Sequence, residues 1–202
     1  MANTAQTDQG AGAARGSVAR AGKIVIIRHA EKPAKDGGPP FGVDANGQSN
    51  DDSLSPLGWQ RAGALMVLFA PARGSLQDSA LAVPRHFFAC GEEKGRKRLR
   101  PVQTVTLLAE RVGTTVDRRF QKGEEAELAD YAMGLEGVVL ICWEHKNLHL
   151  IANRIVGDRA TVPQEWPDDR FDVVWVFELS EGAYRFRQVP QLLLPGDRPH
   201  VI

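Results

Sequence analysis

Two arginines and two histidines are the side chains in this 202-residue sequence best suited to bind and attack a phosphoryl group: Arg28, His29, Arg100 and His145. An arginine guanidinium presents a planar fork of donors that matches phosphate oxygens. A neutral histidine is a competent nucleophile near neutral pH, because its unperturbed pKa is about 6.5. If the fold brings the four side chains together, one imidazole can attack phosphorus while the cations hold the equatorial oxygens, where transition-state charge is spread.

The predicted strands and helices around these residues place the four side chains at one edge of a sheet. Continuous apolar runs predict buried strands at 23–27, 86–90 and 138–143. Arg28 and His29 stand at the end of the first strand, and His145 stands just past the end of the third. Arg100 follows the second strand and precedes a helix that starts at Pro101, whose N-terminus adds partial positive charge. Ligands of an open parallel sheet bind beyond the carboxyl ends of its strands, so the four side chains converge if these strands are neighbours.

The remaining pattern predicts one α/β domain. Ser55 and Pro56 are typical of an N-cap and a first helical position, and Gly113 of a helix stop. The hairpin signal is Glu181-Gly182. Helices are expected at 55–69, 101–112, 124–133 and 148–156, and further strands at 114–116, 171–179 and 183–189. This alternation predicts a three-layer α/β/α sandwich with a mostly parallel central sheet and a small or absent cap.

Composition restricts the class of partner. The chain has 25 basic and 25 acidic residues, and this balance argues against nucleic-acid or membrane-surface binding. No apolar run is long enough to cross a bilayer. Cys90 and Cys142 lie in apolar contexts and are expected to be buried free thiols of a cytoplasmic protein. Residues 1–22 are small and polar and are expected to form a disordered tail, with a transit peptide as the competing interpretation, which leaves 23–202 as the domain.

Four segments, in order, resemble the histidine phosphatase superfamily, also called phosphoglycerate mutase-like. RHAEKP at 28–33 is similar to the family's RHG signature, and LSPLGWQRA at 54–62 is similar to its L-S/T-x-x-G-x-x-Q/R-A helix start. RPVQT at 100–104 resembles the segment that carries the second arginine. VVLICWEH at 138–145 resembles the strand that delivers the second histidine. The resemblance covers most of the chain from residue 23 to about residue 156.

The resemblance implies a fold and a role for each matching residue. His29 would be the nucleophile that becomes phosphohistidine, and Arg28, Arg100 and His145 would clamp the phosphoryl group. The reaction would be hydrolysis of a small phosphorylated substrate or a phosphoprotein, with inorganic phosphate as product. Neither a metal nor another cofactor is implied. His145 and His149 lie four residues apart, but no third metal ligand is evident.

Three positions depart from the family pattern. Ala30 replaces the glycine after the nucleophile, which is tolerable unless φ there is positive. Lys32 stands where some members have a further arginine, so it would supply charge to the substrate without a bidentate fork. The serine that usually follows the second strand is Cys90 or Gly91 here, which removes one phosphate hydrogen bond.

The proton donor for the leaving group is left open by the sequence. Related enzymes take an acidic residue from the segment after the second-arginine helix, which here contains Glu124 and Glu125. Glu31, beside the nucleophile, is the third candidate. A phosphoramidate or acyl phosphate substrate would need less help in releasing its leaving group.

Two alternative functions therefore stand beside a general phosphomonoesterase. One is a phosphatase for phosphohistidine on a partner protein, and the other is a catalytically silent phosphate-binding domain. Substrate specificity is expected in the loop 34–53, where Phe41 is an aromatic residue near the mouth of the site, and around 159–170. The partly apolar tail at 190–202 is expected to pack on the domain or on a neighbouring molecule.

Overall fold

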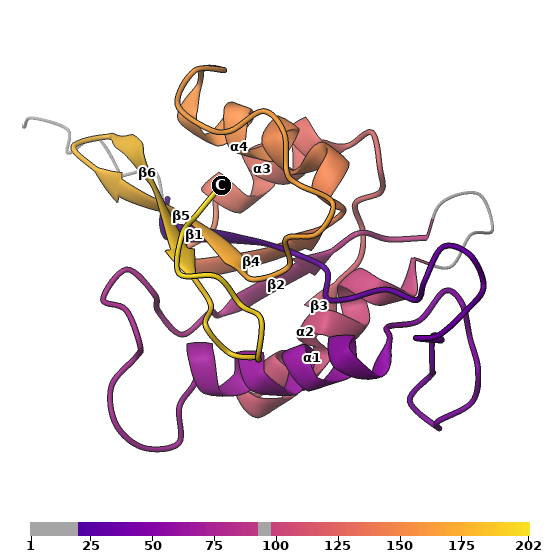
Figure 1. The fold of residues 1–202 in the computed structure, drawn as a ribbon. Coiled ribbons are helices and arrows are strands. Elements are labelled where there is room, and N and C mark those ends of the chain that lie inside the picture. The colour runs from indigo at the N-terminus through magenta and orange to yellow at the C-terminus, as the bar shows by residue number, and fades with distance from the viewer. Residues whose placement is uncertain (1–19, 93–97) are drawn as a thin grey trace, which may run out of the picture.

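The computed structural model describes residues 20–92 and 98–202 and contains a six-stranded sheet in the order β3-β2-β4-β1-β5-β6 (Figure 1). The strands are β1 (Ala21–Arg28), β2 (His86–Ala89), β3 (Val116–Asp117), β4 (Gly137–Trp143), β5 (Val173–Ser180) and β6 (Ala183–Pro190). The helices are α1 (Pro56–Phe69), α2 (Leu99–Arg111), α3 (Glu125–Met133) and α4 (Leu148–Val156), with a 3₁₀ turn at His145–Asn147.

The sheet places the predicted site strands side by side. β1 pairs in parallel with β4, and β4 pairs in parallel with β2, so all three carboxyl ends lie at one edge. β3 extends this parallel half, whereas β5 runs antiparallel to β1 and forms an antiparallel hairpin with β6. Three of the five strand pairs are therefore parallel. The predicted three-layer α/β sandwich with a mostly parallel sheet is confirmed.

Each face of the sheet carries its own apolar core. One core joins the sheet to α3 and α4 through residues such as Leu128, Ile151 and Trp143. The other joins the opposite face to α1 and α2 through residues such as Leu65 and Leu108. Figure 1 shows the two helix pairs on opposite sides of the sheet. Side chains of β1 alternate between the two cores, which explains why its sequence is continuously apolar.

Several element boundaries differ from the sequence expectation by one to three residues. α2 begins at Leu99, two residues before Pro101, because proline is accepted anywhere in the first turn, where N–H groups lack helical partners. The strand expected at 114–116 is the two-residue β3. The hairpin prediction is confirmed, with Glu181 at φ 53° and Gly182 at φ 84°. β1 begins at Ala21, and the tail expected over 1–22 lies almost wholly outside the described residues.

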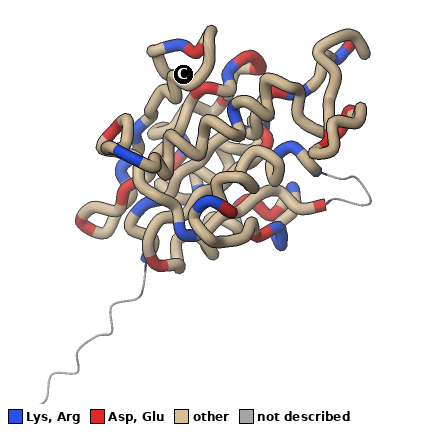
Figure 2. Tube along the Cα trace, turned by 90° about the horizontal axis from the view of Figure 1, so that it is seen from below, with Lys and Arg blue, Asp and Glu red and all other residues tan. Residues whose placement is uncertain are grey.

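The C-terminal segment packs on the domain, which decides between the two expectations for residues 190–202. Gln191 donates to the backbone oxygen of Phe171, and Ile202 donates its N–H to Gln188. Cys90 and Cys142 are buried free thiols, as expected. Basic and acidic residues are interspersed along the trace in Figure 2. Within 20–92 and 98–202, none of the helices has the length and apolarity that crossing a membrane requires.

Substitution of Gly58 tests how closely α1 approaches the chain after β1. A Cβ atom on Gly58 would lie 2.4 Å from the backbone oxygen of Glu31, whereas a Cβ on Gly63 in the same helix would meet nothing within 4 Å. We expect Gly58→Ala to lower the free energy of unfolding by about 1–3 kcal/mol through overpacking. The matched Gly63→Ala should raise it by up to about 1 kcal/mol through helix propensity. Urea unfolding measures both, and equal effects would contradict the close approach.

Candidate active site

The ends of β1 and β4 bring His29 to a cavity of about 320 Å³. Arg28 lies opposite Trp143 in the parallel register, and the N–H of His29 donates to the Trp143 oxygen at 3.1 Å, which continues the ladder by one residue. The lining residues are His29, Asp52, Cys90, Arg98, Leu99, Arg100, Pro101 and Glu144. The cavity therefore joins the end of β1, the start of α2 and the residue that follows β4.

The His29 imidazole is held in one tautomer. Its Nδ1 lies 2.8 Å from the backbone oxygen of Ala30, and because a carbonyl only accepts, Nδ1 carries the proton. Nε2 is therefore the nitrogen with a free lone pair. Burial is the main cause that lowers the pKa of His29 to about 3, and the nearby Arg28, Arg100 and His145 act in the same direction. The side chain is a neutral nucleophile at physiological pH.

In the Arg28 guanidinium, one nitrogen is bound to the protein backbone and the other two have no partner among the residues described. Its Nη1 donates to the backbone oxygens of Pro167, Asp168 and Arg170 at 2.8 to 3.1 Å, and its Cζ lies 3.8 Å from the centroid of the Phe171 ring. Its Nε and Nη2 are buried and have no hydrogen-bond partner among the residues described. Burial lowers its pKa to about 10, so Arg28 stays charged. Buried, unpaired donors of this kind favour an anionic ligand.

Arg100 is fixed to the loop that precedes α1. Its Nε donates to the oxygen of Ser53 at 3.2 Å, and its Nη2 donates to the oxygen of Asp51 at 2.7 Å. Burial lowers the pKa of this guanidinium. These contacts hold a cation at the wall of the cavity that His29 lines.

His145 lines a different cavity, together with residues that include Trp166 and Asp168. Its Nε2 is 2.7 Å from Asp168 Oδ1, and the other oxygen of Asp168 is 3.2 Å from Lys35 Nζ. Hydrogen bonding to Lys35 is the main reason why the pKa of Asp168 falls to about 2. Burial and the nearby Arg28 charge lower the pKa of His145. Of the four predicted residues, His29 and Arg100 share one cavity, while Arg28 and His145 are close enough for their charges to shift the pKa of His29.

Two sequence motifs clamp the backbone that follows His29. The Thr104 hydroxyl accepts the N–H of Ala30 at 2.9 Å and donates to the oxygen of Arg100 at 2.7 Å. The N–H and the hydroxyl of Ser55 both donate to the oxygen of Glu31. RPVQT and LSPLG therefore fix the nucleophile loop from α2 and α1. Ala30 does not have a positive φ, so a side chain is tolerated there, as expected.

The three predicted acids have other partners and do not line this cavity. Glu31 makes a bidentate pair with Arg61. Glu125 accepts from Trp143 Nε1 at 3.1 Å, from Asn147, and from a backbone N–H. Glu124 is exposed and accepts the N–H at the preceding turn. Neither Glu124 nor Glu125 is among the residues that line the cavity with His29, and a proton donor from the segment after α2 stays a prediction.

Two acids that the sequence reasoning missed line the cavity instead. Glu144 lies between β4 and His145, with Oε1 2.8 Å from Lys122 Nζ and Oε2 3.4 Å from Arg98 Nη1. Asp52 comes from the long loop before α1. The signal for Glu144 was its position directly after a buried strand, beside a predicted site histidine.

The glycine at position 91, after β2, has a steric reason. A Cβ on Gly91 would lie 2.3 Å from the backbone oxygen of Arg118, so a serine does not fit there without a backbone shift. Cys90 lines the cavity, and burial raises its pKa to about 11. Its side chain is therefore a neutral thiol at physiological pH.

A buried charge network connects the nucleophile loop to the C-terminal segment. Arg61 in α1 pairs with Glu31 at 2.8 Å and with Asp197 at 2.7 Å, and its Nη1 also donates to Gln191. Both Arg61 and Asp197 side chains are about 5% exposed or less. Asp197 also accepts two backbone N–H groups at 193 and 194.

Comparisons with known proteins give structural similarity at low sequence identity. No family model matches the chain, and no curated protein matches it. A candidate phosphohistidine phosphatase, SixA, from Agrobacterium tumefaciens is 16% identical with a TM-score of 0.49, covering 82% of this chain and 96% of that one. A candidate alpha-ribazole-5'-P phosphatase from Escherichia coli is 13% identical with a TM-score of 0.49, covering 84% and 96%.

A mycobacterial glucosyl-3-phosphoglycerate phosphatase is also similar, with 13% identity and a TM-score of 0.45, covering 84% of this chain and 97% of that one. These values are too low to transfer an activity.

The titration of His29 is the first test of the site. In phosphate-free buffer we expect its ring NMR signals, identified by their loss in His29→Ala, to stay unchanged from pH 8 to pH 5, because its folded pKa is about 3. The unfolded chain binds more protons between about pH 3 and the unfolded pKa of about 6.5. This group therefore makes stability fall as pH falls through that window. A titration midpoint near the unperturbed value would contradict the burial of a neutral imidazole.

Removal of Asp197 tests the buried network. Asp197→Ala leaves the guanidinium of Arg61 half paired in a buried site, and we expect a loss of about 3 kcal/mol in unfolding free energy. The matched control is Asp130→Ala, which removes an exposed pair with Arg154 whose side chains are 48% and 55% exposed. That change should cost at most about 1 kcal/mol. If urea unfolding gave similar losses for both variants, the buried pair would stabilise the protein no more than the exposed one.

Proposed function

We propose that this protein is a metal-independent phosphatase that hydrolyses phosphomonoesters through a phosphohistidine on His29. The observation that carries the proposal is the Nδ1 contact with the Ala30 oxygen, which leaves Nε2 of a neutral, buried imidazole as the nucleophile. The unpartnered Nε and Nη2 of Arg28 supply donors for an anion next to it. The motif resemblance at 28–33, 54–62, 100–104 and 138–145 supports the same assignment.

The first chemical step forms an N–P bond. The Nε2 lone pair of His29 attacks phosphorus, the ester P–O bond breaks, and the leaving oxygen takes a proton from an acid in the cavity. Arg28 and Arg100 stabilise charge on the non-bridging oxygens, which is the role that metal ions fill in other phosphoryl-transfer sites. His145 adds to this positive field only when it is protonated, since burial lowers its pKa.

The second step regenerates the imidazole. Water attacks phosphorus, the N–P bond breaks, a carboxylate takes the water proton, and inorganic phosphate leaves. We assign both proton transfers to the acids that line the cavity, Glu144 and Asp52. Both line the cavity that contains His29, whereas Glu31, Glu124 and Glu125 do not.

A phosphatase for phosphohistidine on a partner protein is the second candidate function. None of the three expected acids lines the His29 cavity, and a phosphoramidate leaving group needs less protonation than an alkoxide. We also propose a cytoplasmic location, since both cysteines are free thiols.

Turnover of p-nitrophenyl phosphate in the presence of a chelator tests the proposal. We expect His29→Ala to reduce the rate by at least about 10³-fold, because it removes the nucleophile. His86→Ala is the control, since His86 contacts the Glu136 oxygen at the opposite end of β2. Rapid quenching should trap a phosphoprotein that survives base and hydrolyses in acid, as a phosphoramidate does.

Four outcomes contradict the proposal or redirect it. Full activity of His29→Ala, or loss of activity with chelator, would overturn the histidine mechanism. Turnover of a phosphohistidine protein without turnover of any ester would favour the second candidate function. Phosphate binding without either activity would identify a silent binding domain.

A further inference from the structure

A second cavity adjoins the proposed phosphoryl site. It has a volume of about 270 Å³ and is lined by the loop that follows the nucleophile, including Lys32, Lys35 and Phe41, together with Asp51 and Arg100. Arg100 also lines the cavity that contains His29. An ester that places its phosphoryl group at His29 can therefore extend its leaving group past Arg100 into this second cavity.

Three cations, Lys32, Lys35 and Arg100, line this cavity beside one carboxylate, Asp51, so the charges of the lining residues favour an anion. After burial, the charges of Arg28 and Lys35 are the main causes that lower the pKa of Lys32, and Arg100 acts in the same direction. The carboxylate of Asp168 opposes this but is already paired with Lys35 and His145. Bringing a second anionic group next to Lys32 would relieve this repulsion between cations.

Two features give the cavity a defined wall. Phe41 lines the cavity and is 51% exposed, so its ring is accessible to a ligand there. The next residue, Gly42, has no room for a side chain, because a Cβ would lie 2.1 Å from the Asn50 oxygen. The N–H of Asn50 in turn donates to the Gly42 oxygen at 2.9 Å. The base of the Phe41 loop is therefore fixed, and the ring stands beside the basic cavity.

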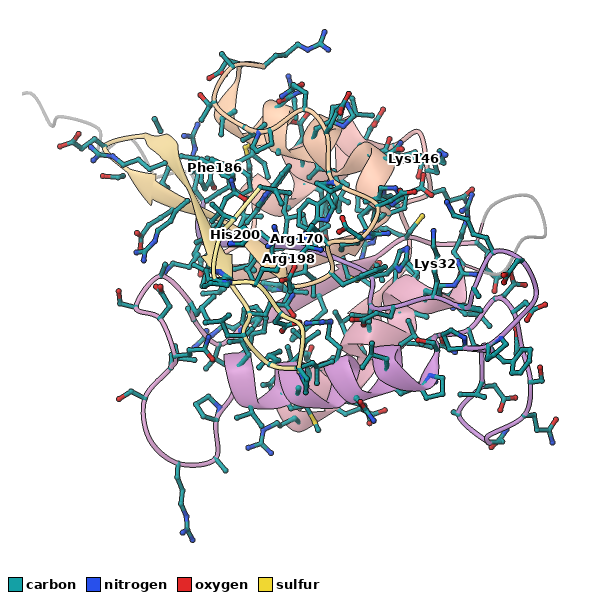
Figure 3. All side chains as sticks on the ribbon, viewed as in Figure 1. Lys32, Lys146, Arg170, Phe186, Arg198 and His200 are labelled. Carbon is teal, nitrogen blue, oxygen red and sulfur yellow. The ribbon has the colours of Figure 1, made fainter. Side chains whose placement is uncertain are left out.

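The lysines approach from the loop and not from the helices. Figure 3 shows the Lys32 side chain rising from the segment after β1, away from α1, whereas Lys146 lies over the 3₁₀ turn after β4. Lys32 is half-buried and Lys35 is exposed. The cavity is therefore open to solvent on the Lys35 side and lies next to the cavity of the buried His29.

From this arrangement we propose that the cavity between Lys32, Lys35 and Phe41 binds the leaving group of the substrate, and that this leaving group carries a second anionic group beside an apolar or aromatic portion. The anion, a carboxylate or a second phosphate, would pair with the two lysines. The apolar portion would contact Phe41. This assignment rests on the proposed phosphatase function and specifies its substrate class.

Binding of two matched esters tests the subsite without requiring turnover. Calorimetry on His29→Ala protein would compare phenyl phosphate with 4-carboxyphenyl phosphate. We expect the carboxylated ester to bind about tenfold more tightly, and Lys32→Met or Lys35→Met added to this background to remove most of that preference. Lys146→Met is the charge-matched control and should retain it. Phe41→Ala should weaken both esters.

The same ratio can be measured as kcat/KM in the chain that retains His29. Loss of the preference in the Lys32 and Lys35 variants, but not in the Lys146 variant, supports the subsite. Equal binding of the two esters, or an equal change in all three lysine variants, overturns it. Absence of turnover with the binding preference intact would reject the phosphatase function and leave the anion subsite standing.

Discussion

The site depends on one constraint, which is the fixed backbone of the three residues that follow β1. The parallel ladder with β4 extends to His29, Thr104 holds the N–H of Ala30, and Ser55 holds the oxygen of Glu31. Because these bonds fix the Ala30 oxygen, they also fix the proton of His29 on Nδ1. The orientation and the protonation of the imidazole are thus consequences of hydrogen bonds from β4, from Thr104 in α2 and from Ser55 at the N-cap of α1.

Burial sets the protonation states of the two site residues at the end of β1. It removes water from the His29 imidazole and from Arg28, which lowers both pKa values, but the guanidinium remains charged and the imidazole becomes neutral. Buried donors without a partner cost free energy, and an anion that enters beside the neutral imidazole would offset that cost. The carbonyls of the segment at 167–170 satisfy one nitrogen of Arg28 and keep the guanidinium in place between β1 and that segment.

The contacts of the acidic residues depend on the tertiary structure and not on their distance from His29 in the sequence. Glu31 stands two residues from the nucleophile, yet it pairs with Arg61 and stabilises the loop. Glu125 is buried and accepts from Trp143. Glu144, which follows β4 directly, is the acid that reaches the cavity of His29. Proximity in sequence is a poor guide for side chains long enough to turn toward a buried arginine or an indole N–H.

The sequence by itself determined the elements and the ends of the strands that matter. The apolar run before Arg28, the N-cap at Ser55 and the hairpin at 181–182 are local signals, since each depends on burial pattern or on φ of a few residues. The tertiary structure alone decided the strand order, the packing of the C-terminal segment and which acids line the cavity. Those depend on contacts between residues tens to more than a hundred positions apart, such as Arg61 with Asp197, which no local pattern encodes.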